Sequence, residues 1–323
     1  MEKNYYVLLY YCYTHIEDPA EFRESHHLYC IEHGLRGRII VAKEGLNGTV
    51  SGLKEDCEAY MSTIKSDPRF AHTEFKIDES DEHTFAKLHV RLKDEIVNAS
   101  LPHIDPTVNT GKYIEPNEFR NILEHDSDDT VILDVRSDYE YKLGKFKNAV
   151  TLDIENFREF PEKVKALESI KDKKVITYCT GGIKCEKASA YLLEQGFENV
   201  YQLHGGIIKY GLETDGKDFE GKCYVFDNRL STEINKANPT VISKCYVTGE
   251  PTDRMVNCAN PHCNMHIPMS VKGGEMYQGC CSKECSENPD VRPYDGTGYY
   301  QTKMNGYNPY RGVKRKGLVR END

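Results

Sequence analysis

Cys179 stands in the stretch of sequence best suited to chemistry, a short loop between two predicted elements. Val175, Ile176 and Tyr178 form a short apolar run typical of a buried strand, and residues 186–195 have the apolar spacing of a helix. Gly181 and Gly182 would let the loop turn its backbone N–H groups inward. Because these groups and a helix N-terminus stabilise negative charge, we expect the thiol pKa to fall below its ordinary value of about 8.5. The sequence therefore predicts a reactive thiolate, with a buried core cysteine as the alternative.

The composition of this loop restricts what the thiolate can do. A phosphatase loop needs an arginine six residues after its cysteine, because the planar guanidinium group holds the phosphoryl oxygens. Cys185 occupies that position, and the loop contains no arginine. Sulfur carried as a persulfide on Cys179 fits this shorter loop better. The rest of the predicted active-site loop consists of Thr180, Gly181, Gly182, Ile183, Lys184 and Cys185.

Two further features near Cys179 each allow two interpretations. Cys185 could be a resolving thiol that forms a disulfide with Cys179, or a small residue packed under the loop. Asp134 and Arg136 lie at the end of a predicted strand at residues 131–135, and the carboxyl ends of parallel strands share one edge of a sheet. This pair could support the site, or could hold loops together without touching substrate.

The 323 residues are enough for two or three domains, and we predict three. Residues 1–105 have the strand and helix order of a ferredoxin-like (acylphosphatase-like) βαββαβ domain. Residues 112–225 alternate strands and helices, which is typical of an α/β domain with a parallel sheet. Residues 226–323 would form a Cys-rich, loop-rich domain with a basic tail.

The first of these units allows more detailed predictions. A helix at residues 20–32 would bury Leu28 and Ile31 on its inner face. The dipeptide Asn47-Gly48 is a strong turn signal and indicates a hairpin of residues 38–42 and 48–50, with its turn at residues 44–48. A strand at residues 88–92 would complete the βαββαβ order.

The formal net charge of −10 argues against a protein that coats nucleic acid generally, although it allows a local basic patch. Candidate RNA contacts are basic residues of the first unit and of the C-terminal tail, namely Arg36, Arg38, Lys43, Arg91, Arg311 and Arg315. An ordinary solvated surface is the alternative interpretation of these residues.

The twelve cysteines are distributed too unevenly for a single disulfide framework. The N-terminus has no basic leader followed by a long apolar run, and no stretch approaches the ~20 apolar residues of a membrane span. We therefore expect a cytoplasmic protein with reduced thiols and no membrane partner. The sequence does not indicate an oligomeric state.

Half of the cysteines lie between residues 245 and 285, in a loop-rich unit with too little core to hold itself together. In cytosolic proteins, such a unit is usually stabilised by a zinc ion bound to thiolates. Adjacent Cys280 and Cys281 point apart and cannot easily share one ion. The cysteines that compete for four zinc positions are Cys245, Cys258, Cys263, Cys281 and Cys285. Reduced thiols inside a small core are the alternative.

Several motifs together resemble a rhodanese domain. They are Asp134-Val-Arg136, Glu140, Gly144, Asn148-Ala149, the Cys179 loop and Gly205-Gly206. The loop sequence Cys-Thr-Gly-Gly-Ile-Lys-Cys-Glu-Lys is more narrowly similar to that of rhodanese-like tRNA uridine hydroxylases, as are the blocks at residues 37–49 and 257–263. The chain departs from this pattern at Lys184, where arginine is usual, and at residues 144–146, where many rhodaneses have Gly-His-Ile. Lysine keeps the positive charge but not the bidentate geometry of arginine.

This resemblance implies an enzyme that converts the wobble uridine of tRNA to 5-hydroxyuridine in an oxygen-dependent reaction. Cys179 would be the catalytic residue, O2 a co-substrate, and the anticodon loop of tRNA the partner, with the target base unstacked. No dinucleotide fingerprint or convincing iron triad is found, so the sequence leaves the identity of any redox cofactor open. One alternative is a sulfurtransferase that passes persulfide sulfur from Cys179 to cyanide or a protein. Another is a non-catalytic RNA-binding scaffold, against which the intact loop argues.

Overall fold

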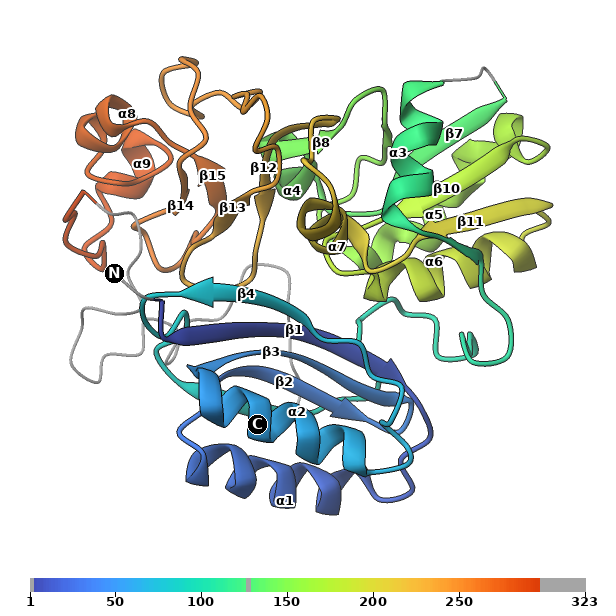
Figure 1. The fold of residues 1–323 in the computed structure, drawn as a ribbon. Helices are drawn as coiled ribbons and strands as arrows, with labels where there is room; N and C mark the ends of the chain where they lie inside the picture. The colour runs from blue at the N-terminus through green and yellow to red at the C-terminus, as the bar shows by residue number, and fades with distance from the viewer. Residues whose placement is uncertain (1–2, 126–128, 297–323) are drawn as a thin grey trace.

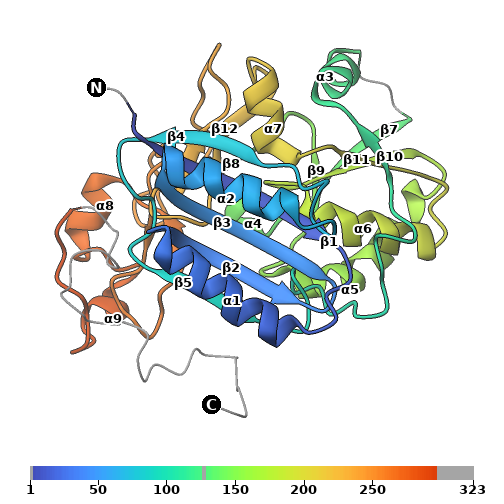
Figure 2. The same cartoon turned by 60° about the horizontal axis from the view of Figure 1, so that its bottom comes forward.

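The computed structural model describes residues 3–125 and 129–296, which form three packed units (Figure 1). The N-terminal unit is a five-stranded sheet with two helices on one face, as Figure 2 shows. Its elements are β1 (Tyr5–Tyr13), α1 (Pro19–Glu32), β2 (Arg36–Ala42), β3 (Gly45–Leu53), α2 (Lys54–Ser66), β4 (Lys76–Ser80) and β5 (Leu88–Leu92). The opposite face of the sheet is turned toward the other two units (Figure 1).

The strand order β4-β1-β3-β2, with antiparallel pairs, confirms the ferredoxin-like prediction. The prediction that residues 88–92 form the last strand of this order is wrong. β4 completes the order, and β5 is an additional edge strand that runs parallel to β2. The sequence of β4, Lys-Ile-Asp-Glu-Ser, is short and polar, so it gives little of the alternation by which a strand is recognised.

The predicted hairpin turn is also displaced. Asn47 and Gly48 lie inside β3, because the register pairs Ala42 with Gly45 and the chain turns between them. Gly48 serves close packing instead, since a Cβ atom there would lie 2.2 Å from the Tyr10 hydroxyl oxygen. The glycine that indicated a turn therefore marks a close approach between two strands.

Leu28 and Ile31 of α1 are 64% and 57% exposed, so the prediction that they are buried is wrong. The helix turns His26 and Cys30 toward the sheet instead. These two residues are four apart and therefore share one face of the helix. His26 Nε2 lies 2.9 Å from the Tyr60 hydroxyl oxygen. A polar contact thus helps to set a helix orientation that hydrophobicity did not indicate.

β1 separates two environments, because successive side chains of a strand point to opposite faces. The side chains that face the helices are buried in the core of the unit: Leu8, Tyr10 and Cys12. Leu9, Tyr11 and Tyr13 point to the other face, toward the central unit. The position of the candidate site depends on this second set.

The central unit contains the predicted parallel sheet, in the order β6-β11-β10-β7-β9. Its strands are β6 (Lys112–Ile114), β7 (Thr130–Asp134), β9 (Val150–Thr151), β10 (Lys174–Tyr178) and β11 (Asn199–Leu203). Its helices are α3 (Pro116–Glu124), α4 (Asp138–Leu143), α5 (Phe160–Val164), α6 (Ile183–Glu194) and α7 (Gly206–Glu213), with short 3-10 helices at Phe157–Glu159 and Lys165–Ile170. Side chains of α5 and α6 pack against one face of the sheet, and those of α3 and α7 against the other. Burial on both faces explains why Val175 and Ile176, adjacent residues of β10, are both apolar.

The remaining chain is rich in loops, as predicted. β12 (Phe219–Tyr224) pairs with β8 (Gly144–Phe146) and β13 (Ser231–Glu233), and β14 (Met255–Asn257) pairs with β15 (His266–Pro268). Two short helices follow, α8 (Val271–Met276) and α9 (Lys283–Ser286). Within residues 3–125 and 129–296, no helix combines the length and the apolar character that a bilayer crossing requires.

Candidate functional site

Cys179 lies where the sequence predicts, between the end of β10 and the start of α6. Gly182 has a φ of +100°, which L side chains rarely adopt, and its N–H group donates to Cys179 Sγ at 3.2 Å. Gly181 allows a close approach, because a Cβ atom there would lie 2.8 Å from Leu9 Cδ2 of the N-terminal unit. One glycine therefore orients a donor toward the sulfur, and the other makes room for a covering strand.

The surroundings of Cys179 favour the thiolate. Burial raises the pKa of this thiol, but a hydrogen bond from Cys185, the charge of Lys184 and the backbone N–H groups of both residues lower the pKa to about 6. Burial and the neighbouring Cys179 raise the pKa of Cys185 well above its ordinary value. Near neutral pH the pair therefore carries one negative charge, on Cys179. Cys185 is fully buried and packed under the loop, and its role as a resolving thiol stays a prediction.

Glu140 of α4 holds the loop in place. Its fully buried carboxylate accepts hydrogen bonds from Lys184 Nζ at 2.6 Å and from Thr180 Oγ1 at 3.3 Å. The Ser137 N–H group donates to the same carboxylate at 3.1 Å, within a capping box at the start of α4. Lys184 is thus fixed beside the thiolate by an ion pair.

Asp134 and Arg136 form a fully buried ion pair, in which Arg136 Nε and Nη2 donate to the two carboxylate oxygens at 2.9 and 2.6 Å. Arg136 also donates to the Gly144 carbonyl oxygen at 2.7 Å and lies over the Tyr178 ring. These contacts join the ends of β7 and β10 to β8. The geometry favours the structural interpretation of this pair over contact with substrate.

The N-terminal sheet covers the Cys179 loop, so that Cys179 is only 1% exposed. The Tyr11 hydroxyl group donates to Glu186 Oε1 at 2.8 Å, and the Tyr13 hydroxyl group donates to the Ile183 carbonyl oxygen at 3.5 Å. Both tyrosines come from β1, and both acceptors from the first turn of α6. Two domains therefore enclose the thiolate.

A buried ion cluster joins the same two units. Lys187 of α6 is fully buried, and its Nζ lies 2.8 Å from Glu44 Oε2 and 2.7 Å from Glu95 Oε1. Glu44 lies in the turn between β2 and β3, within the sequence block 37–49. Two blocks that carry the family resemblance, far apart in the chain, are therefore in contact.

A cavity of about 630 Å³ lies beside the covered loop, between the N-terminal and central units. Its lining comes from both units and includes Tyr11, Lys76, Tyr113, Glu115, Glu186 and His204. Among the residues that the structure describes, Cys179 is not part of this lining. Tyr11 lies between the cavity and the loop, because a Cβ atom at Gly182 would lie 2.9 Å from the Tyr11 hydroxyl oxygen.

The RNA-contact candidates of the N-terminal unit are all exposed: Arg36, Arg38, Lys43 and Arg91. Strand register shows which face they occupy. Arg38 is opposite Thr49 and Thr49 is opposite Leu9, so Arg38 shares the sheet face that covers the active-site loop. The two candidates in the tail, Arg311 and Arg315, lie outside the described residues.

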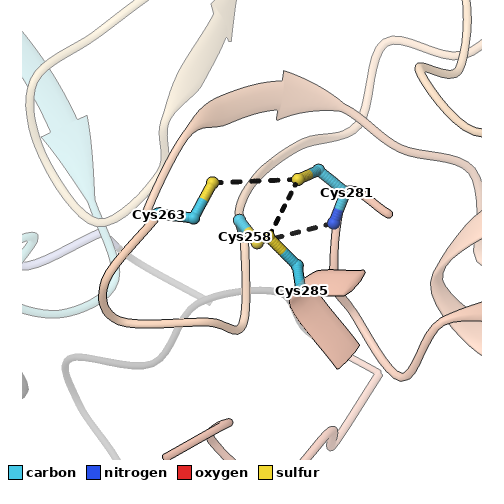
Figure 3. A group of neighbouring side chains, drawn as sticks. All are labelled: Cys258, Cys263, Cys281 and Cys285. Carbon is cyan, nitrogen blue, oxygen red and sulfur yellow. Dashed lines mark hydrogen bonds between the residues drawn. The ribbon is translucent and has the colours of Figure 1, made fainter. Parts of the chain in front are cut away.

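Figure 3 shows four cysteines of the C-terminal region gathered together, Cys258, Cys263, Cys281 and Cys285. Their sulfur atoms all lie within 4.8 Å of one another. Cys281 Sγ is 3.7 Å from Cys263 Sγ and 3.5 Å from Cys285 Sγ. These distances are too long for a disulfide of about 2.05 Å. They fit the edges of a tetrahedron, which measure about 3.8 Å when the Zn–S distance is about 2.3 Å. The donor set and its spacing therefore suit zinc.

Cys245, the fifth candidate ligand, lies outside this group of four. Its sulfur accepts hydrogen bonds from Ser270 Oγ and from the Thr248 N–H group, both at 3.4 Å. Cys280 is fully buried and does not belong to the group either. Of the five cysteines that the sequence leaves in competition, the structure brings four together.

Three family profiles match consecutive parts of the chain. Residues 5–96 match the UPF0176 acylphosphatase like domain, residues 115–213 the Rhodanese-like domain, and residues 220–286 the Rhodanase C-terminal family. Among solved structures, the solution NMR structure of a rhodanese-like domain from Anabaena covers 35% of this chain and 80% of its own, with 26% identity and a TM-score of 0.29.

Curated relatives are similar over nearly the whole length. The tRNA uridine(34) hydroxylase of Cytophaga hutchinsonii is 64% identical over 97% of this chain and 100% of its own. The chain belongs to the tRNA uridine(34) hydroxylase family. The Bacillus licheniformis tRNA uridine(34) hydroxylase is 50% identical over 90% of both chains. The resemblance inferred from the motifs is thereby confirmed, together with its acylphosphatase-like and rhodanese-like parts.

For this member of the tRNA uridine(34) hydroxylase family, the sequence clearly indicates Cys179 but gives much less information about the residues that surround it. The sequence does indicate a contact at Tyr11. Successive side chains of β1 point to opposite faces, and both faces are apolar or aromatic, so the face that does not meet the helices must be covered by another part of the protein. Glu186 and Lys187 belong to the quoted loop motif, yet nothing in the motif indicates that they contact another domain. Lys76 has no signal, because one lysine in a polar strand looks like any exposed lysine.

Proposed function

We propose that this protein hydroxylates the wobble uridine of tRNA to 5-hydroxyuridine, with Cys179 as its catalytic nucleophile. The observation that carries the proposal is the Cys179 thiolate, which loop N–H groups and Lys184 stabilise beneath a second domain. The names of the relatives specify a uridine at position 34 of tRNA as their target. A tRNA substrate also agrees with the cytoplasmic location expected from the sequence.

The residues of the loop have separate roles in this proposal. The Cys179 thiolate would add to the uracil ring, forming a carbon–sulfur bond while an electron pair of the ring double bond moves toward a carbonyl oxygen. Once the neighbouring carbon is hydroxylated and loses its proton, the carbon–sulfur bond would break, which releases the thiolate and restores the double bond. The N–H group of Gly182 keeps the sulfur ionised before the addition. The positive charge of Lys184, which its ion pair with Glu140 holds in place, stabilises the thiolate. O2 is the proposed source of the new oxygen atom, with a two-electron donor reducing its second atom to water, and incorporation of label from isotopically labelled O2 tests this assignment.

The anticodon loop would bind along the basic edge of the N-terminal sheet, where Arg38 and Arg91 are exposed. Chemistry on a base requires that the base leave its stack. Because Cys179 is 1% exposed, the RNA must also displace part of the covering β1 strand to reach the sulfur. Binding and exposure of the thiolate are therefore coupled in this proposal.

Nucleoside mass spectrometry of tRNA from a deletion strain tests the proposal. Wild type should restore 5-hydroxyuridine and its derivatives, and Cys179→Ser should not. Cys30→Ser is a matched control, because Cys30 is also buried but lies in α1. Unchanged tRNA together with lost sulfur transfer from thiosulfate to cyanide would support the sulfurtransferase instead. Full restoration by Cys179→Ser would leave only a non-catalytic scaffold.

We also propose a structural zinc ion, held by Cys258, Cys263, Cys281 and Cys285. The support is the donor set of four thiols and sulfur separations of 3.5 and 3.7 Å, close to the edges of a ZnS4 tetrahedron. Such an ion would connect the loop after β14 to α9. Elemental analysis of the purified chain should find one zinc per chain, and Cys281→Ser should lose it. A metal-free wild-type chain that remains fully stable would contradict the assignment.

A further inference from the structure

Lys76 of β4 is an unusual residue to find in the wall of a cavity. Its side chain is 4% exposed, and the nearest carboxylate oxygen, of Glu74, is 4.0 Å away. With the residues that the structure describes, Lys76 Nζ makes no hydrogen bond. A buried ammonium group is unfavourable unless a partner accepts its hydrogen bonds. Lys76 thus has unused donor capacity beside the cavity.

Aromatic rings line the same cavity as this ammonium group. Tyr11, Tyr13 and Tyr113 all line the cavity, and Lys76 Nζ lies 4.9 Å from the centroid of the Tyr11 ring. The hydroxyl groups of Tyr11 and Tyr113 both donate to Glu186 Oε1 at 2.8 Å, which holds the two rings in position. Proteins that bind unstacked bases use rings of this kind as stacking surfaces.

The charge of the wall indicates which part of a nucleotide the cavity can take. The carboxylates of Glu74, Glu115 and Glu186 line it together with Lys76. Lys209 and His204 already pair with Glu74 and Glu115, so among the described residues the cavity has no surplus of cations to hold a phosphate group. Uracil is neutral and offers one N–H donor and two carbonyl acceptors, so it can bond to a lysine and a carboxylate at once. The volume of about 630 Å³ lies within the range of small-ligand sites.

We propose that this cavity receives the uracil base of the target nucleotide, and that Lys76 donates a hydrogen bond to one of its carbonyl oxygens. The inference rests on the proposed function, since it assigns a place to the substrate of that reaction. Lys76 comes from the N-terminal unit and Cys179 from the central unit, so the two domains would share one substrate. The Tyr11 ring separates the cavity from the sulfur in this structure, and the reaction requires that ring to move aside.

Two RNAs test the proposal on the full-length protein. One is an anticodon stem–loop with uridine at the wobble position, and the other is the same RNA with an abasic wobble nucleotide. Wild type should bind the uridine RNA more tightly. Lys76→Met should bind the uridine RNA about tenfold more weakly than wild type, because it loses one charge-assisted hydrogen bond. Its affinity for the abasic RNA should be unchanged.

Lys54→Met is the matched control, because Lys54 also lies over a tyrosine ring, that of Tyr6 at 5.1 Å, but does not line the cavity. It should bind both RNAs as wild type does. Equal losses for both RNAs in Lys76→Met would indicate a backbone contact and overturn the proposal, as would no loss at all. If Lys76→Met does not fold, Tyr113→Leu replaces it, with the same selective loss expected and the same contrary outcomes. Absence of 5-hydroxyuridine with wild type would refute the proposed function separately.

Discussion

Cys179 and the four-cysteine cluster of the C-terminal region place the same functional group in two different settings. At Cys179, a single negative charge is stabilised by a hydrogen bond from the Cys185 thiol, by the charge of Lys184 and by loop N–H groups, including that of Gly182. In the cluster, sulfur faces sulfur, with Cys281 Sγ 3.7 and 3.5 Å from two neighbours. The first setting isolates one nucleophile, whereas the second presents four ligands to a common centre.

The two settings also differ in what completes them. The cluster is built within residues 258–285, so one short stretch of chain supplies all of its donors. The Cys179 loop is finished by β1 of another domain, and Lys187 connects to that domain through Glu44 and Glu95. We infer that a dense run of cysteines indicates which thiols gather in the fold, whereas the surroundings of a reactive cysteine depend on neighbours that are distant in the sequence.

Cys179→Ser should have the largest effect on activity. It should distinguish the reactive cysteine from the four-cysteine cluster, because activity should be lost while stability is kept. Formation of 5-hydroxyuridine should fall by about 1,000-fold or more, because the nucleophile is lost. The midpoint of thermal unfolding should remain close to that of wild type. Single-turnover assays with purified tRNA and calorimetry measure the two quantities. Retained activity would show that the sulfur of Cys179 is not the nucleophile.

Cys281→Ser should give the opposite pattern. Loss of one of four thiolates weakens zinc binding, and the free energy of that binding contributes directly to folding, so stability should fall by several kcal/mol. A chelator added to wild type should reproduce the lower unfolding temperature, and added zinc should reverse it. A chelator that leaves the unfolding temperature of wild type unchanged would mean that no metal contributes to this region.

Lys187→Met should loosen the cover of Cys179 without changing the loop itself. It leaves Glu44 and Glu95 without their shared cation, which should cost about 3 kcal/mol of stability. Alkylation of Cys179 at fixed pH should become faster, because the N-terminal sheet separates more often. Lys165→Met is the control, since Lys165 forms an exposed ion pair with Glu162. Equal alkylation rates in Lys187→Met and wild type would show that this cluster does not hold the cover closed.

Arg38→Ala should have the smallest effect, a loss of tRNA affinity of about threefold to tenfold. The slope of log affinity against log salt should decrease by about one, as expected for a single phosphate contact. Arg158→Ala, which changes an exposed side chain of the central unit, should leave both quantities unchanged. A salt slope equal to that of wild type would remove Arg38 from the RNA interface.

The sequence predicts the reactive loop because everything that creates it is local. A strand, two glycines and a helix lie within about twenty residues, and the groups that lower the pKa of Cys179 belong to the same stretch: the Cys185 thiol, the charge of Lys184 and the loop N–H groups. The parallel sheet is predictable for a similar reason, since burial on both faces leaves apolar runs.

The remaining features depend on contacts between distant residues. The polar strand that contains Lys76 is identified by its pairing with β1 rather than by hydrophobicity. The orientation of α1 depends on a hydrogen bond between His26 and Tyr60. In the sequence, Gly48 indicates a turn. In the structure, glycine is needed there because the Tyr10 side chain leaves no room for a Cβ atom. None of these contacts leaves a periodic pattern in the chain.

The ionisation of Cys179 can be measured from the ultraviolet absorbance of the thiolate, as the difference between wild type and Cys179→Ser over a pH series. The pKa is lowered to about 6, so the sulfur should be ionised above that pH and protonated below it. The difference signal should therefore appear with an inflection near pH 6, and hydroxylation should be lost as the pH falls through the same value. An inflection at or above about 8.5, the ordinary value for a free cysteine, would contradict the account.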